Sequence, residues 1–385
     1  MVLQQNREIR VWGRANPQTR VTVKLSDKQL AVSVDSSGRW QAVFPAMPAG
    51  GPYALALSGP AGPIDTISNI LVGEVWLCSG QSNMAYRMFQ MNDHLRETAA
   101  PPDSIRLLTI DRNHGVTPLV DFAKAPEWQV ADPDSVLPFS AACFLFAREM
   151  QKSMDVPFGL INSSWGGSAI ESWISAEGLR GVGGFDRSLD LNTLYGKNPE
   201  QALERFVAGW KDWWSQAGGE TPGPWDSGYD DKGWTDAPPG LGDWQQWKNA
   251  GTEDFTGMVW YRKTFELTPA QAEGGAVLDL GGVDELDVTW VNGEAIGTRF
   301  GWGDLRQYGL EPGVLKPGLN VLSVNVYNGW GAGGLNGPPE AISLRLADGA
   351  RIPLGEGWRY QLAAPEFGSP PKAPWESITG VTGLY

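Results

Sequence analysis

The stretch Gly73-Glu-Val-Trp-Leu-Cys-Ser-Gly-Gln-Ser-Asn-Met84 constrains the fold of this chain more than any other. Its residues 75–78 form an apolar run with β-branched and aromatic side chains, which predicts a buried strand. The small polar turn that follows can cap a helix through Ser82 or Asn83. A strand, a tight turn and a helix start would place the Ser82 hydroxyl at the carboxyl edge of a sheet, where open α/β sheets bind their ligands.

Two further strand-like runs, 105–110 and 158–161, follow at distances that allow crossover helices. Residues 141–150 predict one such helix, with Phe144, Ala147 and Met150 along one face. Right-handed crossovers would bring the loops after Ile110 and Ile161 to the same edge as Ser82. The sequence therefore predicts a sheet of three parallel strands with an unpaired, apolar edge.

Segments rich in short strands flank this α/β region. Residues 1–68 alternate between apolar and polar side chains and predict a small β-sandwich. After a predicted helix that carries Trp210, Trp213 and Trp214, short strand patterns are separated by frequent turns, which favours a sandwich or jelly roll. These strands are expected at residues 259–263, 276–280, 286–291, 320–326 and 341–346.

The block at residues 73–84 closely resembles the first block of the sialate O-acetylesterases, a carbohydrate-esterase branch of the SGNH hydrolases. The segments 1–4, 139–142, 159–168 and 170–173 support the resemblance in the order of the family. Three later segments resemble a galactose-binding-like jelly roll, and residues 379–385 resemble the return into the hydrolase. These three are 260–262, 288–293 and 316–320.

The resemblance implies a multidomain α/β plus β protein, a partial flavodoxin-like SGNH hydrolase with an N-terminal β-sandwich and an inserted β jelly roll. The expected domains are the sandwich at 1–68, the first half of the hydrolase at 69–200, the jelly roll at 201–370 and the truncated return at 371–385. The implied reaction removes O-acetyl groups from sugars, either sialic acid or acetylated plant glycans, through an acyl-enzyme.

Acyl transfer needs a nucleophile, a base and donors for the oxyanion. We expect Ser82 to be the nucleophile, although a serine in such a turn can serve as a mere helix cap. Gly167 is expected to donate its N–H to the oxyanion, with Gly166 allowing close approach and the Ser82 N–H as a second donor. A plain tight turn is the alternative for the two glycines.

The base is harder to assign because the chain has only two histidines. His94 would lie ~18 Å from Ser82 if the intervening segment were helical. Asp111 and His114 have the Asp-x-x-His spacing of the family's orienting acid and base, but in the family that pair follows a second block that this chain lacks. We interpret the match as coincidental, and expect the chain to be an incomplete piece of a longer protein that is inactive and poorly soluble alone.

Charge and composition limit other functions. A net charge of −14 argues against a nucleic-acid partner. The sequence predicts no cofactor, no metal site and no membrane span, and oligomeric state stays open. The two cysteines, Cys78 and Cys143, are expected to be buried free thiols rather than a disulfide. We expect a periplasmic or secreted protein whose signal peptide is not in this chain.

The rival hypothesis is a carbohydrate-binding protein without catalysis. The chain has 19 tryptophans, for which core packing and sugar stacking are both reasonable roles. Trp302, Trp330 and Tyr327 lie in a glycine-rich part of the predicted jelly roll and are the candidates for sugar contact. Either way, the expected partner is a carbohydrate, O-acetylated in the case of the esterase.

Overall fold

A computed structural model describes residues 1–113, 115–119, 121–122, 124–248 and 251–376. The described residues form two compact units, one of residues 1–113 and 119–170, the other of residues 115–118 and 171–376. The main segment of the first unit ends at Ile170, and that of the second begins at Glu171. The predicted return segment 379–385 lies outside the described residues.

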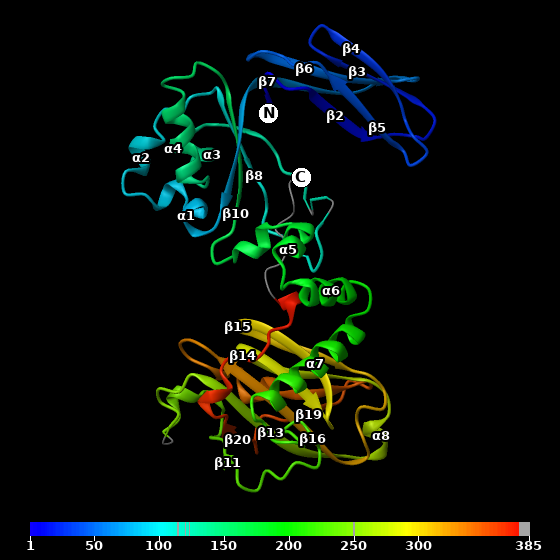
Figure 1. The fold of residues 1–385 in the computed structure, drawn as a ribbon, viewed down its shortest axis with the longest axis vertical. Helices are drawn as coiled ribbons and strands as arrows, with labels where there is room; N and C mark the ends of the chain where they lie inside the picture. Colours follow the sequence, from blue (N-terminus) through cyan, green and yellow to red (C-terminus); the bar gives the residue numbers. More distant parts are fainter. Residues whose placement is uncertain (114, 120, 123, 249–250, 377–385) are drawn as a thin grey trace. The chain divides into compact units, whose positions relative to one another are not determined.

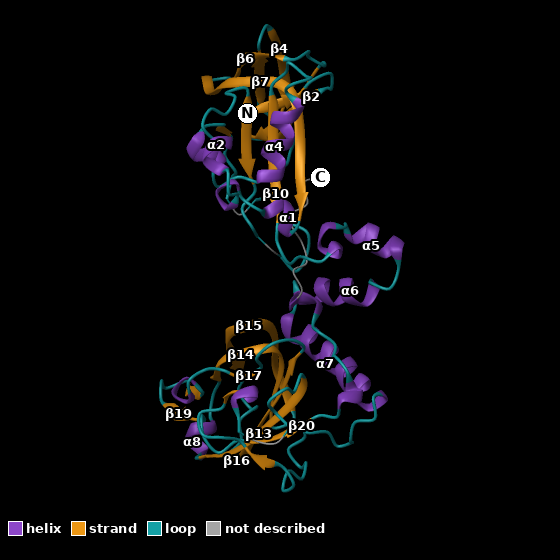
Figure 2. Cartoon of the chain, turned by 90° about the vertical axis from the view of Figure 1, so that its left-hand side faces the viewer, coloured by secondary structure: helices purple, strands orange, loops and turns teal. Residues whose placement is uncertain are grey.

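The first unit is built on one eight-stranded sheet in which the long strand β7 (Gly62–Gly80) is shared by two regions (Figures 1 and 2). The strand order is β4-β3-β6-β7-β10-β8-β9, with β1 paired to β7. A separate pair, β2 and β5, completes the unit. The remaining bounds are β1 Val2–Gln4, β2 Ile9–Arg14, β3 Arg20–Leu25, β4 Lys28–Ser33, β5 Arg39–Phe44, β6 Gly50–Gly59, β8 Ile105–Thr109, β9 Gln129–Val130 and β10 Phe158–Ser164.

In the N-terminal part of this unit, the pair β2 and β5 packs face to face against the end of the large sheet formed by β4, β3, β6 and the start of β7. Alternate residues of β5 and β3 point inward, so Trp40 and Phe44 from one sheet share a core with Val23 and Leu55 from the other. The predicted boundary at residue 68 falls inside β7, so these sheets and the α/β region share one continuous strand.

The α/β region contains the three predicted parallel strands, in the order β7-β10-β8. The predicted helix is confirmed as α4 (Ala141–Met150), which begins where the Ser140 hydroxyl accepts a hydrogen bond from the Cys143 N–H. Phe144 and Ala147 of α4 are buried against one face of the sheet. Three short helices accompany it: α1 Ser82–Ala85, α2 His94–Glu97 and α3 Pro133–Val136.

On the edge of β7 that faces away from β10, no described strand pairs with residues 74–80. Leu77 on this stretch is 52% exposed and Trp76 is 40% exposed. Such a row of backbone donors and acceptors is able to pair with another strand. This part of the sheet agrees with the open edge that the sequence predicts.

The expectation of two free thiols is wrong, because Cys78 and Cys143 form a disulfide. Cys78 lies on the face of β7 that α4 covers, and Cys143 is on the facing turn of α4, so their Cα atoms are 5.9 Å apart. That separation lies within the range that a disulfide spans. The sequence indicated that each cysteine is buried. The structure places both in one core, which brings the two sulfur atoms together.

The described residues of the second unit form four α-helices and a ten-stranded sheet whose strand pairs are all antiparallel. The predicted Trp-rich helix is confirmed as α7 (Pro199–Gln216), capped by the side chain of Asn198. The predicted strands 276–280 and 286–291 are joined in one strand, β14 (Ala276–Val291), whose register shifts take up the irregular residues between them.

The other elements of this unit complete the sheet and its connections. The helices are α5 Ala176–Val182, α6 Asp186–Tyr195 and α8 Pro269–Ala272; the strands are β11 Thr235–Asp236, β12 Gly242–Asp243, β13 Gly257–Leu267, β15 Glu294–Leu310, β16 Gly318–Asn328, β17 Gly334–Leu335, β18 Ser343–Leu346, β19 Arg351–Pro353 and β20 Arg359–Leu362.

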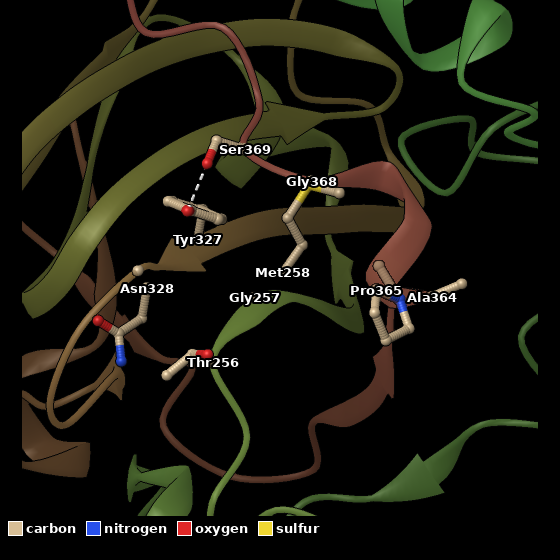
Figure 3. Close-up of a pocket in the computed structure, with 11 residues that line it drawn as sticks. Thr256, Gly257, Met258, Tyr327, Asn328, Ala364, Pro365, Gly368 and Ser369 are labelled. Atoms are coloured by element: carbon tan, nitrogen blue, oxygen red, sulfur yellow. Dashed lines mark hydrogen bonds between the residues drawn. The ribbon is translucent and has the colours of Figure 1, made fainter.

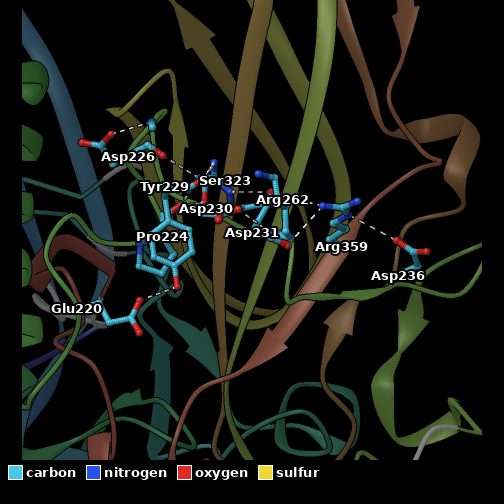
Figure 4. Close-up of polar contacts among 12 residues, drawn as sticks. Glu220, Pro224, Asp226, Tyr229, Asp230, Asp231, Asp236, Arg262, Ser323 and Arg359 are labelled. Carbon is cyan, nitrogen blue, oxygen red and sulfur yellow. Dashed lines mark hydrogen bonds and ion pairs between the residues drawn. The ribbon is translucent and has the colours of Figure 1, made fainter.

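Most tryptophans of α7 and of the sheet beneath it serve packing. Trp210 of α7 is fully buried and its ring lies within 6.0 Å of the rings of Trp214, Trp225, Trp260 and Trp290, measured between centroids. A polar network ties the segment after α7 to the sheet: the buried Arg262 of β13 pairs with Asp231 and donates to the carbonyl of Pro224 (Figure 4). These contacts identify the aromatic-rich region as core.

Candidate active site

Ser82 is the first residue of α1, not its cap. The expected cap at Ser82 or Asn83 is wrong because Gln81 precedes the helix and its side-chain oxygen accepts the N–H of Ser82. The capping role is therefore filled one residue earlier, and the Ser82 hydroxyl is not used for it. Ser82 is exposed at the carboxyl end of β7, the position that the strand–turn–helix pattern predicts.

Gln81 holds the Ser82 hydroxyl in the structure. Ser82 Oγ donates to Gln81 Oε1 at 3.0 Å, and the Ser82 N–H donates to the same oxygen at 3.3 Å. Gln81 Nε2 in turn reaches the carbonyl of Ser168 at 3.5 Å. Sequence reasoning assigned Gln81 no role; its place directly before the proposed nucleophile was the available signal.

The structure brings Gly166 next to Ser82. Strand β10 pairs with β7 so that Ser164 lies opposite Gly80, and the Trp165 N–H donates to the Gly80 carbonyl at 2.9 Å. A Cβ atom placed on Gly166 would lie 3.3 Å from Ser82 Oγ. The two loops that sequence patterns placed on one sheet edge are thus in contact.

Gly167 follows in the same turn with a φ of +81°, a backbone conformation that favours glycine. The Ser168 N–H bonds back to the Trp165 carbonyl at 3.3 Å, which closes the turn around Gly166 and Gly167. No other atom lies within 4 Å of a Cβ placed on Gly167. The space beside this residue is open on the side where a side chain would stand.

The loop after β8 reaches the same edge. The Ile110 N–H donates to the Asn162 carbonyl of β10 at 2.9 Å, which places the exposed Asp111 and Arg112 beside the end of that strand. The Arg112 guanidinium lies over the Trp165 ring, 5.7 Å from its centroid. His114, the expected partner of Asp111, lies outside the described residues.

His94 is not separated from Ser82 by a continuous helix, so that premise is wrong. Helix α1 ends at Ala85, and a 3₁₀ turn at Met88–Gln90 precedes α2. The His94 Nδ1 bonds the Met91 carbonyl at 2.7 Å, and no histidine of the described residues is hydrogen-bonded to Ser82. The described part of the chain also holds no cluster of three or more His, Cys, Asp or Glu side chains that could bind a metal.

Comparison with known proteins assigns this region to a family of esterases. Residues 72–197 match the family model described as carbohydrate esterase, sialic acid-specific acetylesterase. The chain is similar to the sialate O-acetylesterase of Homo sapiens, with 34% identity over 191 residues, 45% of this chain and 36% of that protein. The Pongo abelii enzyme of the same name is 33% identical over the same shares of both chains.

Among solved structures, a carbohydrate acetylesterase from Xanthomonas citri is similar, with 36% identity and a TM-score of 0.44 over 46% of this chain and 40% of that one. The match to the mammalian relatives spans only about a third of their length, 36%. No helix of the described residues is long and apolar enough to cross a membrane.

Proposed function

We propose that the protein to which this chain belongs removes O-acetyl groups from sugars with Ser82 as nucleophile, because residues 72–197 match the family model of sialic acid-specific acetylesterases. The single observation that supports this most is the exposed Ser82 hydroxyl at the end of a parallel strand with Gly166 beside it. Nothing but Gln81 binds that hydroxyl among the described residues.

In the proposed reaction, Ser82 Oγ attacks the carbonyl carbon of the acetyl ester while its proton passes to a base. The C–O bond to the sugar then breaks, and the leaving oxygen takes that proton. Water attacks the acetyl-serine in the second half and releases acetate. The N–H groups of Gly167 and Ser82 are the proposed donors to the oxyanion.

In the free protein the Ser82 N–H donates a hydrogen bond to the Gln81 carboxamide oxygen. The substrate carbonyl oxygen would take that N–H in the complex, so the Gln81 side chain has to turn away. The Ser82 hydroxyl is released from Gln81 by the same movement and becomes able to donate to a base. Gln81 thus accepts the hydrogen bond of the Ser82 hydroxyl until substrate binds.

The base is proposed to come from outside the described residues. It is either His114 or a histidine in sequence beyond Tyr385, and we favour the latter because the family places its Asp-x-x-His pair late in the domain. A chain of residues 1–385 would then be inactive alone, because an unassisted serine hydroxyl is a weak nucleophile.

The experiment compares hydrolysis of an aryl acetate by the full-length protein and by residues 1–385. Ser82→Ala should remove nearly all turnover by the full-length protein and leave its circular dichroism unchanged. Gly167→Val should lower kcat by about 100-fold, the cost of losing one oxyanion donor. Wild-type turnover in Ser82→Ala would reject the nucleophile. Ser82-dependent turnover by residues 1–385 that is lost in His114→Ala and kept in His94→Ala would assign the base to His114.

We further propose that residues 201–370, the larger part of the second unit, are a galactose-binding-like jelly roll inserted into the hydrolase, with the other domain limits as given above, and that the protein is secreted or periplasmic. The antiparallel pairing of the sheet supports the first proposal. The Cys78–Cys143 disulfide supports the second, because disulfides persist in oxidising compartments.

Carbohydrate binding by the second unit is the second candidate function. Trp330 is 83% exposed and Trp302 is 69% exposed, in contrast to the buried tryptophans around α7. Both lie near one part of β14: Trp302 pairs with Asp284, and Glu285 accepts the N–H of Gly329, the residue before Trp330. Large exposed indoles suit stacking on sugar rings.

A cavity of about 140 Å³ opens beside this region (Figure 3). It combines apolar surface from Met258 and Pro365 with the hydroxyls of Tyr327 and Ser369, which lie 2.5 Å apart. If this surface binds sugar, Trp330→Ala should abolish oligosaccharide binding measured by calorimetry. Trp12→Ala, which removes an indole that is 73% exposed in the first unit, should not.

A further inference from the structure

The cavity of about 140 Å³ in the second unit is small and uncharged (Figure 3). An apolar cavity of about 150 Å³ holds one benzene molecule, so this one takes a substituent of a few heavy atoms rather than a whole oligosaccharide. The eleven described residues that line it carry no charge. The cavity therefore suits a small neutral group, because an ion would lose its hydration there without gaining a charged partner.

One part of the cavity is apolar and another part can donate a hydrogen bond. The Met258 side chain, which is 2% exposed, and the side chains of Ala364 and Pro365 supply the apolar part. On the polar side, the hydroxyls of Tyr327 and Ser369 lie 2.5 Å apart. Only one of their two protons serves the bond between them, so the other hydroxyl keeps a proton that it can donate to a ligand. A group with a methyl at one end and a carbonyl oxygen at the other matches both parts.

The loop that carries the exposed Trp330 is held in place by buried hydrogen bonds. Asn328 is fully buried; its carboxamide oxygen accepts the Trp330 N–H at 3.1 Å, and its nitrogen donates to the Gly331 carbonyl at 2.9 Å. Gln245 donates to the same carbonyl at 3.0 Å and accepts the Gly333 N–H at 2.9 Å. A residue that is positioned before its ligand arrives lowers the entropic cost of association. The indole of Trp330 is thus presented on a preorganised loop.

The loop and the cavity adjoin one another. Asn328 and Gly329 line the cavity and directly precede Trp330 in the chain. A sugar ring stacked on Trp330 would lie next to the cavity, so that one of its substituents can enter. An acetyl group makes use of both parts of the cavity, because its methyl can contact Met258 while its carbonyl oxygen accepts a hydroxyl proton. A bare sugar hydroxyl would gain only the polar contact.

We propose that this cavity receives an acetyl substituent of a glycan stacked on Trp330, so that the second unit binds acetylated chains more tightly than their deacetylated forms. This inference rests on the proposed carbohydrate-binding function of the second unit and names the group that is recognised. The site is formed by residues of the second unit alone, and binding there needs no hydrolysis. Acetyl groups on oxygen and on nitrogen share the methyl and the carbonyl, and the test separates them.

The test measures binding by calorimetry to the full-length protein carrying Ser82→Ala, and chromatography after each titration confirms that the esters are intact. The probes are acetylated xylotetraose, the same chain after alkaline deacetylation, and the tetramer of N-acetylglucosamine. Acetylated xylotetraose should bind at least 10-fold tighter than the deacetylated chain, from burial of a methyl group together with one hydrogen bond. Tight binding of the N-acetylglucosamine tetramer as well would extend the site to acetamido groups.

Two changes in the cavity should reduce this preference for the acetylated chain. Ala364→Leu fills the apolar part and should abolish the preference, while the deacetylated chain binds as before. Tyr327→Phe/Ser369→Ala removes both hydroxyls and should reduce the preference about 5-fold, the effect of one hydrogen bond. Ala270→Leu is the matched control, because it makes the same substitution at an exposed alanine of α8 that does not line the cavity.

Equal binding of the acetylated and deacetylated chains, or no binding of any of the three probes, would overturn the proposal, whether or not Ala364→Leu folds. Loss of the preference in Ala270→Leu would also overturn it, as would a full preference in an Ala364→Leu protein that keeps its melting temperature. Trp330→Ala tests the carbohydrate-binding function separately. Unchanged binding in Trp330→Ala would reject that function, whereas Trp330-dependent binding without an acetyl preference would reject only the role of the cavity.

Discussion

A side-chain carbon on Gly166 would lie 3.3 Å from Ser82 Oγ, closer than most side-chain contacts allow. Gly166 follows β10 and Ser82 follows β7, and these strands pair in parallel up to the Gly80 and Ser164 pair. The closeness of the two residues is therefore set by sheet register. A side chain at Gly166 would require Ser82 to shift by a few tenths of an ångström.

We expect Gly166→Ala to lower kcat for an aryl acetate by ~100-fold, because a small displacement of a reacting group is that costly. The melting temperature should change little, since Gly166 does not have a positive φ. Gly167→Ala should lower the melting temperature as well, because its φ of +81° disfavours alanine. Steady-state kinetics and thermal melts of both variants in the full-length protein check this; wild-type kcat in Gly166→Ala would contradict it.

Removing the disulfide should destabilise the first unit. Cys78 and Cys143 are 65 residues apart in sequence, so the link restricts a long loop of the unfolded chain and contributes about 4 kcal/mol. In the variant Cys78→Ala/Cys143→Ala, the free energy of unfolding should fall by that amount. Guanidinium titrations would show this as a lower midpoint concentration. Dithiothreitol should lower the stability of the wild type and leave the double variant unchanged. A wild type insensitive to reductant would contradict the prediction.

Removing one partner of the buried ion pair should destabilise the second unit. Arg306 Nε lies 2.8 Å from Asp287 Oδ1, and both side chains are 0% exposed. Burial raises the pKa of Asp287, and Arg306 opposes that effect. Arg306→Met should cost about 3–5 kcal/mol in chemical denaturation because it leaves the carboxylate unpaired. Adding Asp287→Leu should restore much of the loss; a double variant as unstable as the single one would argue against the pair as the cause.

Asp284 should make the second unit less stable as the pH rises. Burial, with a smaller contribution from Glu285, raises the pKa of Asp284 from 3.8 to about 6 in the folded state. The folded form binds the proton more tightly than the unfolded form, so stability is lost as the pH rises from 3.8 through about 6.

Asp284→Asn should therefore raise the melting temperature at pH 7.5, with a smaller gain at pH 4. Melts of both proteins across this range test the prediction. Glu340→Gln, a substitution at an exposed carboxylate in the same unit, serves as the control. The same gain at both pH values would mean that ionisation of Asp284 is not responsible.

The sequence predicts the elements whose residues form regular apolar patterns. The strand at Glu74–Cys78 and helix α4 are confirmed, and parallel pairing then brings Gly166 to Ser82. Strand β15 was missed because its glycines interrupt the alternation of side chains. Its place depends on hydrogen bonding to β14 along the backbone, which side-chain patterns do not report.

Three features of this region depend on contacts that sequence spacing does not show. Gln81 is not among the residue types that usually cap helices, so only its place directly before Ser82 pointed to this contact. The disulfide joins residues that are far apart in the chain, and only the packing of α4 on β7 brings them together. The position of Arg112 over Trp165 likewise follows from the pairing of β8 with β10.

Strand β7 runs without a break from Gly62, beside β6, to Gly80, two residues before Ser82. No flexible tether separates the N-terminal sheets from the strand that leads to Ser82, the proposed nucleophile. Deleting the first 68 residues would strip β7 of β6 and β1 and leave half of a strand without neighbours. The N-terminal sheets thus support the strand that leads to Ser82, and we expect the two regions to melt in one transition and to be inherited together rather than shuffled as separate modules.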